Sequence, residues 1–370
     1  REFLTRSTQA NRFNHKEIKE VMDLCLACKG CKAECPSNVD VAKLKMEFLY
    51  QYQKENGTPL RSWLVGHFAS VSSYASRVPF LYNLVMGTPF LRRISNRMVG
   101  FHPERTMPLM AKQTLWSWLK GRHSIQSSKA VYLFVDEFTN FNDAEVGRKA
   151  VLLLEALGYE VRTLQHPISG RSFLSKGMLD EARKLAQANV ELWSALVTEE
   201  IPLVGIEPSA ILTFRDEYPD LVSDAWLIKA QDLSKNVLLL EEFIAREADA
   251  KRIDKKVFKA EKRLLKLHGH CQQKSMSSLV AAKKALSLPE NFEVQLIPSG
   301  CCGMAGSFGY EKEHYDLSMQ IGELVLFPTV RAQGPEVEIV ASGTSCRHQI
   351  HDGTQRHAKH TAEILFEALA

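Results

Sequence analysis

The chain has 370 residues, enough for two or three domains that each bury a core of ordinary size. Its composition, with 45% hydrophobic and 24% charged residues and a formal net charge of +4, is normal for a soluble globular protein. No apolar run reaches the roughly 18–20 residues that span a bilayer, which excludes a transmembrane helix.

The sequence starts at Arg1 rather than at a methionine, and no charged-then-apolar leader follows. We therefore expect no signal peptide, and we expect the chain to be a fragment or to begin partway into a longer polypeptide. Four of the eight cysteines lie within eleven residues and two more are adjacent. This placement suits metal binding in a reducing compartment better than disulfides, so the expected location is cytoplasmic.

The first region, residues 1–58, is polar and helix-prone and contains a C-x2-C-x2-C-x3-C-P run made of Cys25, Cys28, Cys31, Cys35 and Pro36. This is the spacing of bacterial ferredoxins, in which thiolates bind iron and one short loop wraps three corners of a cubane. A zinc site usually pairs two C-x2-C knuckles across a longer gap. The run therefore predicts a 4Fe–4S cluster.

The fourth cysteine of this run has two possible roles. In two-cluster ferredoxins the fourth cysteine of each run ligates the other cluster, and this chain has a single run. Either Cys35 closes its own cubane, or it reaches a second cluster whose other ligands lie upstream of Arg1. We favour the second interpretation.

The second region, residues 59–127, is basic and aromatic, with nine Lys or Arg and one acid, Glu104, which gives it a charge of about +8. Five prolines cut it into short helices. The pattern predicts peripheral attachment to an anionic membrane, at its inner face, or docking to an acidic partner domain. Nucleic acid is not an expected partner, because no recognition motif accompanies the charge.

From Ala130 onwards apolar, β-rich runs alternate with helical stretches, in two regions that comprise residues 128–250 and 251–370. The predicted strands are 130–135, 159–164 and 201–206, then 265–268, 292–297 and 337–341. The predicted helices are 142–157, 178–197, 275–287, 313–327 and 360–369. Such alternation indicates parallel sheets with helical crossovers. The expected fold is therefore α/β, with a helical ferredoxin-type cluster domain followed by two duplicated α/β modules.

The two α/β regions resemble each other in the spacing of the residues that follow their strands. In the second region these residues are Cys271, Cys301-Cys302-Gly303 and Cys346, and in the first they are Glu137, Ile168-Ser169-Gly170 and Ala210. The interval from Glu137 to Ser169 is 32 residues, and that from Cys271 to Cys302 is 31. We infer a duplicated module whose first copy has lost all four thiols and kept the glycine.

The thiols of the second copy form a second candidate site, because each follows a predicted strand, where open α/β sheets place ligands. A metal or cluster would be held by Cys271, Cys301, Cys302 and Cys346, with His270 and His348 as alternates. The other interpretation is reduced, partly buried thiols. Between iron–sulfur and zinc the residues leave the choice open. His351, His357 and His360 lie in a polar tail and are expected at the surface.

No catalytic residue can be named from the sequence. It offers no Ser–His–Asp or Cys–His arrangement, no Gly-x-Gly-x-x-Gly and no P-loop. A site for a nucleotide or a flavin is therefore not expected within this chain.

The motif Cys301-Cys302-Gly303, with Cys271 before it and Cys346 after it, resembles the cysteine-rich "CCG" domain. That domain occurs in heterodisulfide reductases and in the iron–sulfur subunits of glycolate oxidase and anaerobic glycerol-3-phosphate dehydrogenase. The family closes its motif with C-x-x-C, whereas Gln349 stands here at the second position. That departure leaves the ligand set open.

A closer resemblance is to D-2-hydroxyglutarate and D-lactate dehydrogenase-like proteins, which fuse an FAD-linked oxidase to an iron–sulfur half. It rests on three stretches and covers essentially the whole chain: residues 21–40, 205–209 and 342–349. The resemblance implies that FAD, in a missing upstream half, oxidises a D-2-hydroxy acid of the lactate, 2-hydroxyglutarate or glycolate class. Electrons would then pass through this chain to a quinone or another carrier. It also implies an upstream cysteine motif just before the position of Arg1.

Two other functions stay open at this point. One is a heterodisulfide-reductase-like subunit in which Cys301 and Cys302 act on a substrate disulfide. The loss of thiols from the first copy weakens it, because a two-centre reaction would need both copies. The other is a zinc-stabilised interaction module, which would leave the ferredoxin-type run unexplained.

Overall fold

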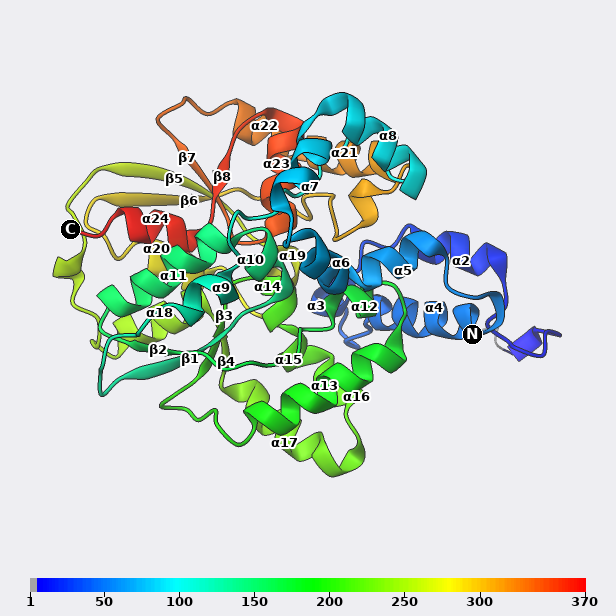
Figure 1. The fold of residues 1–370 in the computed structure, drawn as a ribbon, viewed down its shortest axis with the longest axis horizontal. Helices are drawn as coiled ribbons and strands as arrows, with labels where there is room; N and C mark the ends of the chain where they lie inside the picture. The colour runs from blue at the N-terminus through cyan, green and yellow to red at the C-terminus, as the bar shows by residue number, and fades with distance from the viewer. Residues whose placement is uncertain (1–4) are drawn as a thin grey trace.

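The computed structural model describes residues 5–370 and consists of a helical N-terminal part and two sheets with their covering helices (Figure 1). The helical part, coloured blue to cyan, starts at the right of the view and continues to the top of the molecule. The two sheets occupy the left and centre. Helix α3, which carries part of the four-cysteine run, lies near the centre of the view, and the C-terminus lies at the left end of the long axis (Figure 1).

Three helices flank the four-cysteine run, namely α2 (Lys16–Asp23), α3 (Gly30–Glu34) and α4 (Val41–Asn56). Asp40 caps α4 by accepting a hydrogen bond from the Lys43 backbone N–H at 3.1 Å. On its inner side α4 buries Met46 in a small apolar cluster with Phe173 and Met178. This cluster attaches the N-terminal helices to the first α/β module.

Five short helices follow, as the prolines predict: α5 (Leu60–Gly66), α6 (Phe68–Ala75), α7 (Pro79–Gly87), α8 (Pro89–Val99) and α9 (Leu115–Lys120). Pro79 and Pro89 stand at the first positions of their helices, where the missing N–H costs no helical hydrogen bond. The fully buried Arg105 donates to Gln349 Oε1 at 2.8 Å and pairs with Asp352 at 3.1 Å. These contacts attach the basic segment to the second module.

The first sheet has four parallel strands in the order β2-β1-β3-β4. They are β1 (Ala130–Phe134), β2 (Glu160–Arg162), β3 (Leu203–Gly205) and β4 (Val237–Leu239). Its helices are α10 (Glu137–Phe141), α11 (Ala144–Ala156), α12 (Arg171–Ser175), α13 (Leu179–Trp193), α14 (Pro208–Ile211), α15 (Thr213–Asp216), α16 (Tyr218–Leu221), α17 (Asp224–Lys235) and α18 (Leu240–Asp249). Because helices shield the sheet, its central strands β1 and β3 are apolar and largely buried.

The second sheet repeats this arrangement with the order β6-β5-β7-β8, again parallel. The strands are β5 (Arg263–His268), β6 (Phe292–Leu296), β7 (Glu338–Ala341) and β8 (Ala358–Lys359). The helices are η1 (Lys255–Val257), α19 (Cys271–Met276), α20 (Val280–Leu286), η2 (Phe308–Tyr310), α21 (Tyr315–Leu324), α22 (Leu326–Arg331), α23 (Thr344–Thr354) and α24 (Thr361–Glu367). The identical strand order confirms the predicted α/β fold with duplicated modules.

The register of the strands shows which residues of the two copies are equivalent. Phe134 at the end of β1 pairs with Gly205, and His268 at the end of β5 pairs with Ala341. Glu137 follows Phe134 by three residues, and Cys271 follows His268 by three residues, so Glu137 corresponds to Cys271. Phe134 and His268 therefore occupy the same place in the two modules.

The two modules share one hydrophobic core, and each has a smaller buried cluster of its own. Helix α11 of the first copy packs against α24 of the second, and α18 of the first packs against α20 of the second. Leu133, Val151, Leu265 and Leu365 all belong to this core. The proposed boundary at residue 250 is therefore crossed by packing contacts, and the division at residues 58, 127 and 250 stays a prediction.

Several details differ from the sequence-based expectation. Each sheet has a fourth strand, β4 or β8, of three or two residues, which is too short to show a periodicity. The helices expected at 275–287 and 313–327 are each broken into two. The surface position predicted for His360 is wrong, because its ring is buried and lies 3.2 Å from the carbonyl of Ile206 in the first module.

Candidate metal centres

The ferredoxin-type loop directs backbone N–H groups at its sulfurs. Ala27 N–H donates to Cys25 Sγ at 3.4 Å, and Val41 N–H donates to Cys31 Sγ at 3.3 Å. Ala27 has a φ of 50°, a left-handed conformation that tightens the turn between these thiols. Hydrogen bonds to sulfur stabilise the thiolate form and tune the potential of an iron–sulfur cluster. The donor set and the loop geometry therefore fit a cluster at Cys25–Cys35.

A buried lysine fixes this loop to the first module. The Lys29 side chain is fully buried, and its ammonium contacts Asp216 and lies 3.0 Å from Glu217 and 3.1 Å from Asp40. Burial opposes the charge, but Glu217 and Asp216 outweigh it and raise the pKa of Lys29. Arg171 shares Glu217 at 2.7 Å. The position of the loop is therefore set by a desolvated charge network.

The loop also touches the second cysteine site. Helix α3 packs against α19, whose first residue is Cys271. The Ser275 hydroxyl lies 3.1 Å from the Cys28 carbonyl and 3.0 Å from the Cys271 carbonyl. Burial raises the pKa of the Cys28 thiol, and the nearby Cys271 adds to the shift. Two cysteine groups that are about 240 residues apart in sequence are thus neighbours in space.

The four cysteines of the second module form a continuous chain of thiols. Cys271 contacts Cys301, Cys301 contacts Cys302, and Cys302 contacts Cys346. The hydrogen bond with Cys301, and then burial, raise the pKa of the Cys271 thiol well above its usual value. The structure thus brings together all four thiols that the sequence placed at the ends of strands, and soft sulfur donors at such density suit iron or zinc.

Gly303 allows the backbone to turn beside these thiols. Its φ is 96°, and a Cβ at this position would collide with the backbone carbonyl of Ser318. Gly170, the equivalent residue of the first copy, also has a positive φ, of 73°. Both copies therefore keep the backbone turn, whether or not they carry thiols.

One histidine at the site, His268, was not identified from the sequence. A ring nitrogen of His268 and the sulfurs of Cys302 and Cys346 all lie within 4.8 Å of one another, and all three residues are buried. His270, an alternate named from the sequence, lies near Cys346 across Gly343, since a Cβ there would be 3.3 Å from both the His270 Nε2 and the Cys346 sulfur.

His348, the other predicted alternate, lies near Asp143 and Arg347, and burial lowers its pKa. The signal that could have identified His268 was its place at the very end of β5, three residues before Cys271. Histidine is less often fully buried than the apolar residues that usually end a core strand.

In the first copy the corresponding space is filled by a carboxylate and a hydroxyl. The Glu137 carboxylate accepts hydrogen bonds from the Ser169 backbone N–H at 3.1 Å and from its hydroxyl at 2.7 Å. Burial raises the pKa of Glu137. Ala210, at the place of Cys346, offers no donor. At this place the first copy therefore pairs its carboxylate with its own serine.

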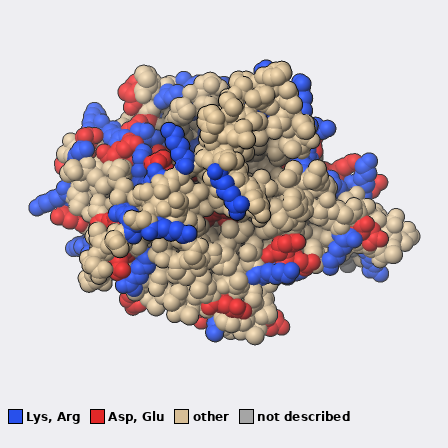
Figure 2. Space-filling model, viewed as in Figure 1, with Lys and Arg blue, Asp and Glu red and all other residues tan. Residues whose placement is uncertain are grey.

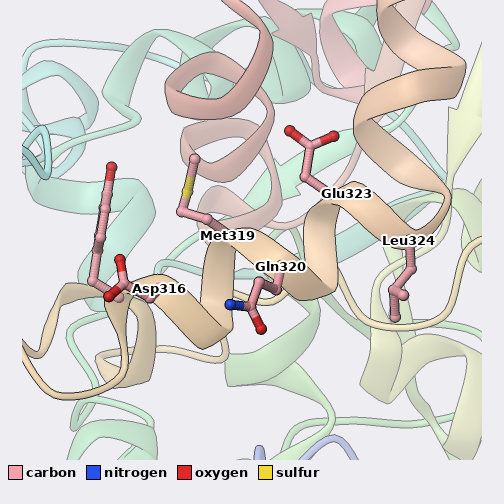
Figure 3. Close-up of a pocket in the computed structure, with 6 residues that line it drawn as sticks. Asp316, Met319, Gln320, Glu323 and Leu324 are labelled. Atoms are coloured by element: carbon pink, nitrogen blue, oxygen red, sulfur yellow. The ribbon is translucent and has the colours of Figure 1, made fainter.

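One surface hollow on the second module is unrelated to the cysteines. It has a volume of about 480 Å³ and is lined only by α21 residues, among them Asp316, Met319 and Glu323 (Figure 3). Figure 3 shows these side chains spread along one side of the helix without converging on a common point. The hollow therefore has no arrangement of polar groups that would orient a ligand.

Comparison with known proteins supports an iron–sulfur role. Residues 1–40 match the family model described as a 4Fe–4S dicluster domain.

Within residues 5–370, no helix is both long and apolar enough to cross a membrane.

Curated relatives match nearly the whole chain. D-2-hydroxyglutarate dehydrogenase of Escherichia coli K12 is 27% identical over 96% of this chain, which spans 35% of that enzyme, its C-terminal part. The enzyme of the same name from Pseudomonas putida is 26% identical with the same coverage. One subunit of the anaerobic glycerol-3-phosphate dehydrogenase of E. coli K12 is 25% identical over 90% of this chain and 83% of its own length.

Among solved structures, a hypothetical protein from Helicobacter pylori aligns with 98% of this chain and 73% of its own, at 13% identity. The TM-score is 0.36, too low to support an argument about the fold.

Proposed function

We propose that this chain is the iron–sulfur electron-transfer part of a flavin-dependent oxidoreductase for D-2-hydroxy acids. The observation that carries the proposal is the contact between the two cysteine groups, in which the loop at Cys28 meets the start of α19 at Cys271. Two redox centres placed side by side form a route for electrons, whereas a structural zinc would not need such a neighbour.

Within this route the residues of the chain have distinct tasks. Cys25, Cys28, Cys31 and Cys35 would hold a 4Fe–4S cluster, with Cys35 reaching towards a second one, and Cys271, Cys301, Cys302 and Cys346 would hold a further cluster or metal. Such clusters accept and release single electrons when bound. The protein sets their environment through the N–H donors of Ala27 and Val41, through burial and through the Lys29 network.

The flavin and the substrate belong to a partner domain or subunit. FAD there would take a hydride from a 2-hydroxy acid and pass electrons one at a time to this chain, which would deliver them to a quinone or another carrier. The support comes from the relatives, which are named as dehydrogenases.

Anaerobic purification with iron, sulfide and zinc analysis and EPR of the reduced protein tests the proposal. We expect iron and sulfide in about equal amounts, at about four atoms or more per chain, and a reduced-cluster EPR signal. Cys28→Ser should reduce the iron content and alter the signal, whereas the exposed Ser37→Ala in the same loop should change neither. A protein that holds only zinc after anaerobic reconstitution would contradict the proposal in favour of an interaction module.

The thiol–disulfide alternative predicts a different result. If Cys301 and Cys302 acted on a disulfide, the reduced protein would cleave a small disulfide substrate stoichiometrically and Cys301→Ser would abolish this reaction. We expect no such cleavage by the metal-loaded protein, because the four thiols would be ligands.

We further propose that helices α7 and α8 rest on an anionic membrane surface. Their exposed side chains include several large apolar ones, and the exposed fractions are 79% for Phe80, 69% for Phe90 and 81% for Met98. Arg97 is also exposed on α8. Figure 2 shows a wide area without charged side chains at the top of the view, with Lys and Arg at its edge, over the place of α7 and α8 in Figure 1. Apolar side chains bordered by cations favour an interfacial position on acidic lipids.

Vesicle co-sedimentation tests this placement. Binding should require anionic lipid and weaken with salt, and the double variant Phe80→Ser, Phe90→Ser should bind several-fold less. Exposed Leu324 on α21 lies outside these two helices, so Leu324→Ser serves as the matched control and should bind as the unmodified chain does. Equal binding to neutral and anionic vesicles, or none to either, would exclude the proposal.

A further inference from the structure

The end of strand β5 presents a buried imidazole to the second thiol group. His268 is 1% exposed, and one of its ring nitrogens forms a compact group with the Cys302 and Cys346 sulfurs. Among the described residues its Nε2 has no hydrogen-bond partner. A buried polar atom without a partner costs free energy comparable to a lost hydrogen bond, so its retention calls for a ligand.

The other ring nitrogen is held in place. His268 Nδ1 lies 2.7 Å from the Ser299 hydroxyl. If Nδ1 carries the hydrogen and donates it to Ser299 Oγ, the lone pair is left on Nε2, the nitrogen that is free to bind a metal. Metal-binding histidines are commonly oriented in this way, by a hydrogen bond from the nitrogen that does not bind the metal.

The Ser299 segment is itself held by Lys274, which donates to the carbonyls of Ser299 at 2.7 Å and of Gly300 at 2.6 Å. Lys274 lies on α19, the helix that starts with Cys271. The hydrogen-bonded support of His268 is therefore continuous with the thiol site.

The first copy provides an internal comparison. At the place of His268 it has Phe134, and at the place of Ser299, three residues before Ser169, it has His166. His166 stacks on Phe134 with ring centroids 4.3 Å apart, so this copy fills the space with an aromatic pair. The imidazole at the strand end is present only in the copy that carries thiols.

Gln349 does not offer a competing donor. It follows Cys346 by three residues, but its amide oxygen accepts from Arg105 at 2.8 Å and its nitrogen donates to the Ser318 carbonyl at 2.9 Å. Both ends of this side chain are thus occupied by structural contacts.

We propose that His268 Nε2 is a ligand of the metal bound at Cys302 and Cys346, which makes this centre a mixed imidazole–thiolate site for iron or zinc. The inference rests on the metal centre proposed above. A neutral imidazole in place of a thiolate lowers the negative charge of the ligand set, and in clusters with histidine ligands this raises the reduction potential. The second centre would then accept electrons more readily than an all-cysteine centre in the same place.

The test uses the unmodified chain labelled with ¹⁵N-histidine, loaded with iron and sulfide or with zinc. For iron the readout is nitrogen hyperfine coupling in pulsed EPR of the reduced protein, and for zinc it is the nitrogen-to-sulfur ratio from X-ray absorption. We expect a coordinated histidine nitrogen in whichever metal form the protein adopts. Sulfur-only coordination would overturn the inference while leaving the metal centre intact.

Variants then identify the residue. His268→Gln should remove the nitrogen signal, and His268→Cys should retain the metal and shift the midpoint potential to more negative values. Ser299→Ala should keep the signal but weaken metal affinity by about tenfold or more. His166→Gln in the first copy is the matched control for loss of a buried histidine, and it should change none of these readouts.

Two outcomes separate this inference from the proposed function. A signal that survives His268→Gln and disappears in His270→Gln would assign the ligand to His270 and overturn the inference. If the chain binds iron at Cys25–Cys35 but no metal at the four thiols of the second module, the second metal centre does not exist and the inference is wrong. The proposed electron-transfer role of the first cluster would still stand. If His268→Gln does not fold, two measurements still test the inference. The labelled unmodified chain shows whether a histidine nitrogen binds the metal, and His270→Gln shows whether that nitrogen belongs to His270.

Discussion

The two α/β modules have the same strand order but different contents at equivalent places. Gly170 and Gly303 make the same kind of left-handed turn, yet Ser169 precedes one and Cys302 the other. Where the second copy has Cys271 and Cys302, the first has a Glu137 carboxylate hydrogen-bonded to Ser169. The same backbone turn is thus present with and without thiols beside it, because the turn is also part of the packing.

The first copy has acquired other tasks at the same end of its sheet. Asp216 and Glu217 on its helical segments bind Lys29 of the ferredoxin-type loop. Glu207 accepts a hydrogen bond from the Thr344 backbone N–H, at the start of α23, at 2.8 Å. One module therefore offers thiols, and the other positions the elements that carry thiols.

The largest expected effect comes from removing the lysine that joins the loop to the first module. Lys29→Ala leaves Asp216 and Glu217 buried with fewer cations, so we expect the free energy of unfolding to fall by about 3–5 kcal/mol. Lys16→Ala, at an exposed i,i+4 pair on α2, should change it by less than about 0.5 kcal/mol. Denaturant unfolding measures both, and equal effects would show that the network does not anchor the loop.

The two glycines offer a direct comparison of the copies. Gly303→Ala forces a Cβ into the Ser318 carbonyl at a positive φ, for an expected cost of about 3 kcal/mol. Gly170→Ala has the same conformational strain, but its Cβ would meet Leu185 at 3.4 Å, an ordinary contact, so we expect about 1 kcal/mol. Thermal unfolding of both variants measures the two losses of stability. A larger loss in Gly170→Ala than in Gly303→Ala would contradict the prediction.

The buried His166 of the first copy predicts a dependence on pH. Burial lowers its pKa to about 4, below the usual 6.5 of an unfolded chain. Between pH 4 and pH 6.5 the unfolded state binds more protons than the folded state. The free energy of unfolding that depends on a neutral His166 is therefore fully present above pH 6.5 and is lost as the pH falls towards 4. Between pH 7 and pH 5, the free energy of unfolding of His166→Gln should fall by about 2 kcal/mol less than that of the unmodified chain. Parallel pH profiles would contradict the assignment.

The smallest effect is expected at the hydroxyl that occupies the place of a thiol. Ser169→Ala removes one of the two hydrogen bonds to Glu137 and should cost about 1 kcal/mol without changing the metal content. Cys302→Ala, at the equivalent place, should lose metal from the second centre. Metal analysis of both variants distinguishes the copies, and metal loss from Ser169→Ala would mean that the first copy still takes part in binding.

Much of this organisation could be predicted from the sequence, because it depends on local patterns. The strands before Cys271 and Cys346 are rich in Leu, Ile and Val, and the cysteine spacing at Cys25–Cys35 is specific in itself. Contacts between distant segments could not be predicted in the same way. The burial of Lys29 depends on Asp216, which is 187 residues away, and the position of His268 beside Cys346 depends on the register of two strands.

The interlocked packing of the two modules has a consequence for how fast electrons could move. Helices α11 and α18 of the first copy lie against α24 and α20 of the second, and the loop at Cys28 is attached to both copies. No hinge needs to close before the two cysteine groups meet. Transfer between them should therefore proceed by tunnelling across a fixed gap, at a rate that does not change when glycerol or sucrose thickens the solvent.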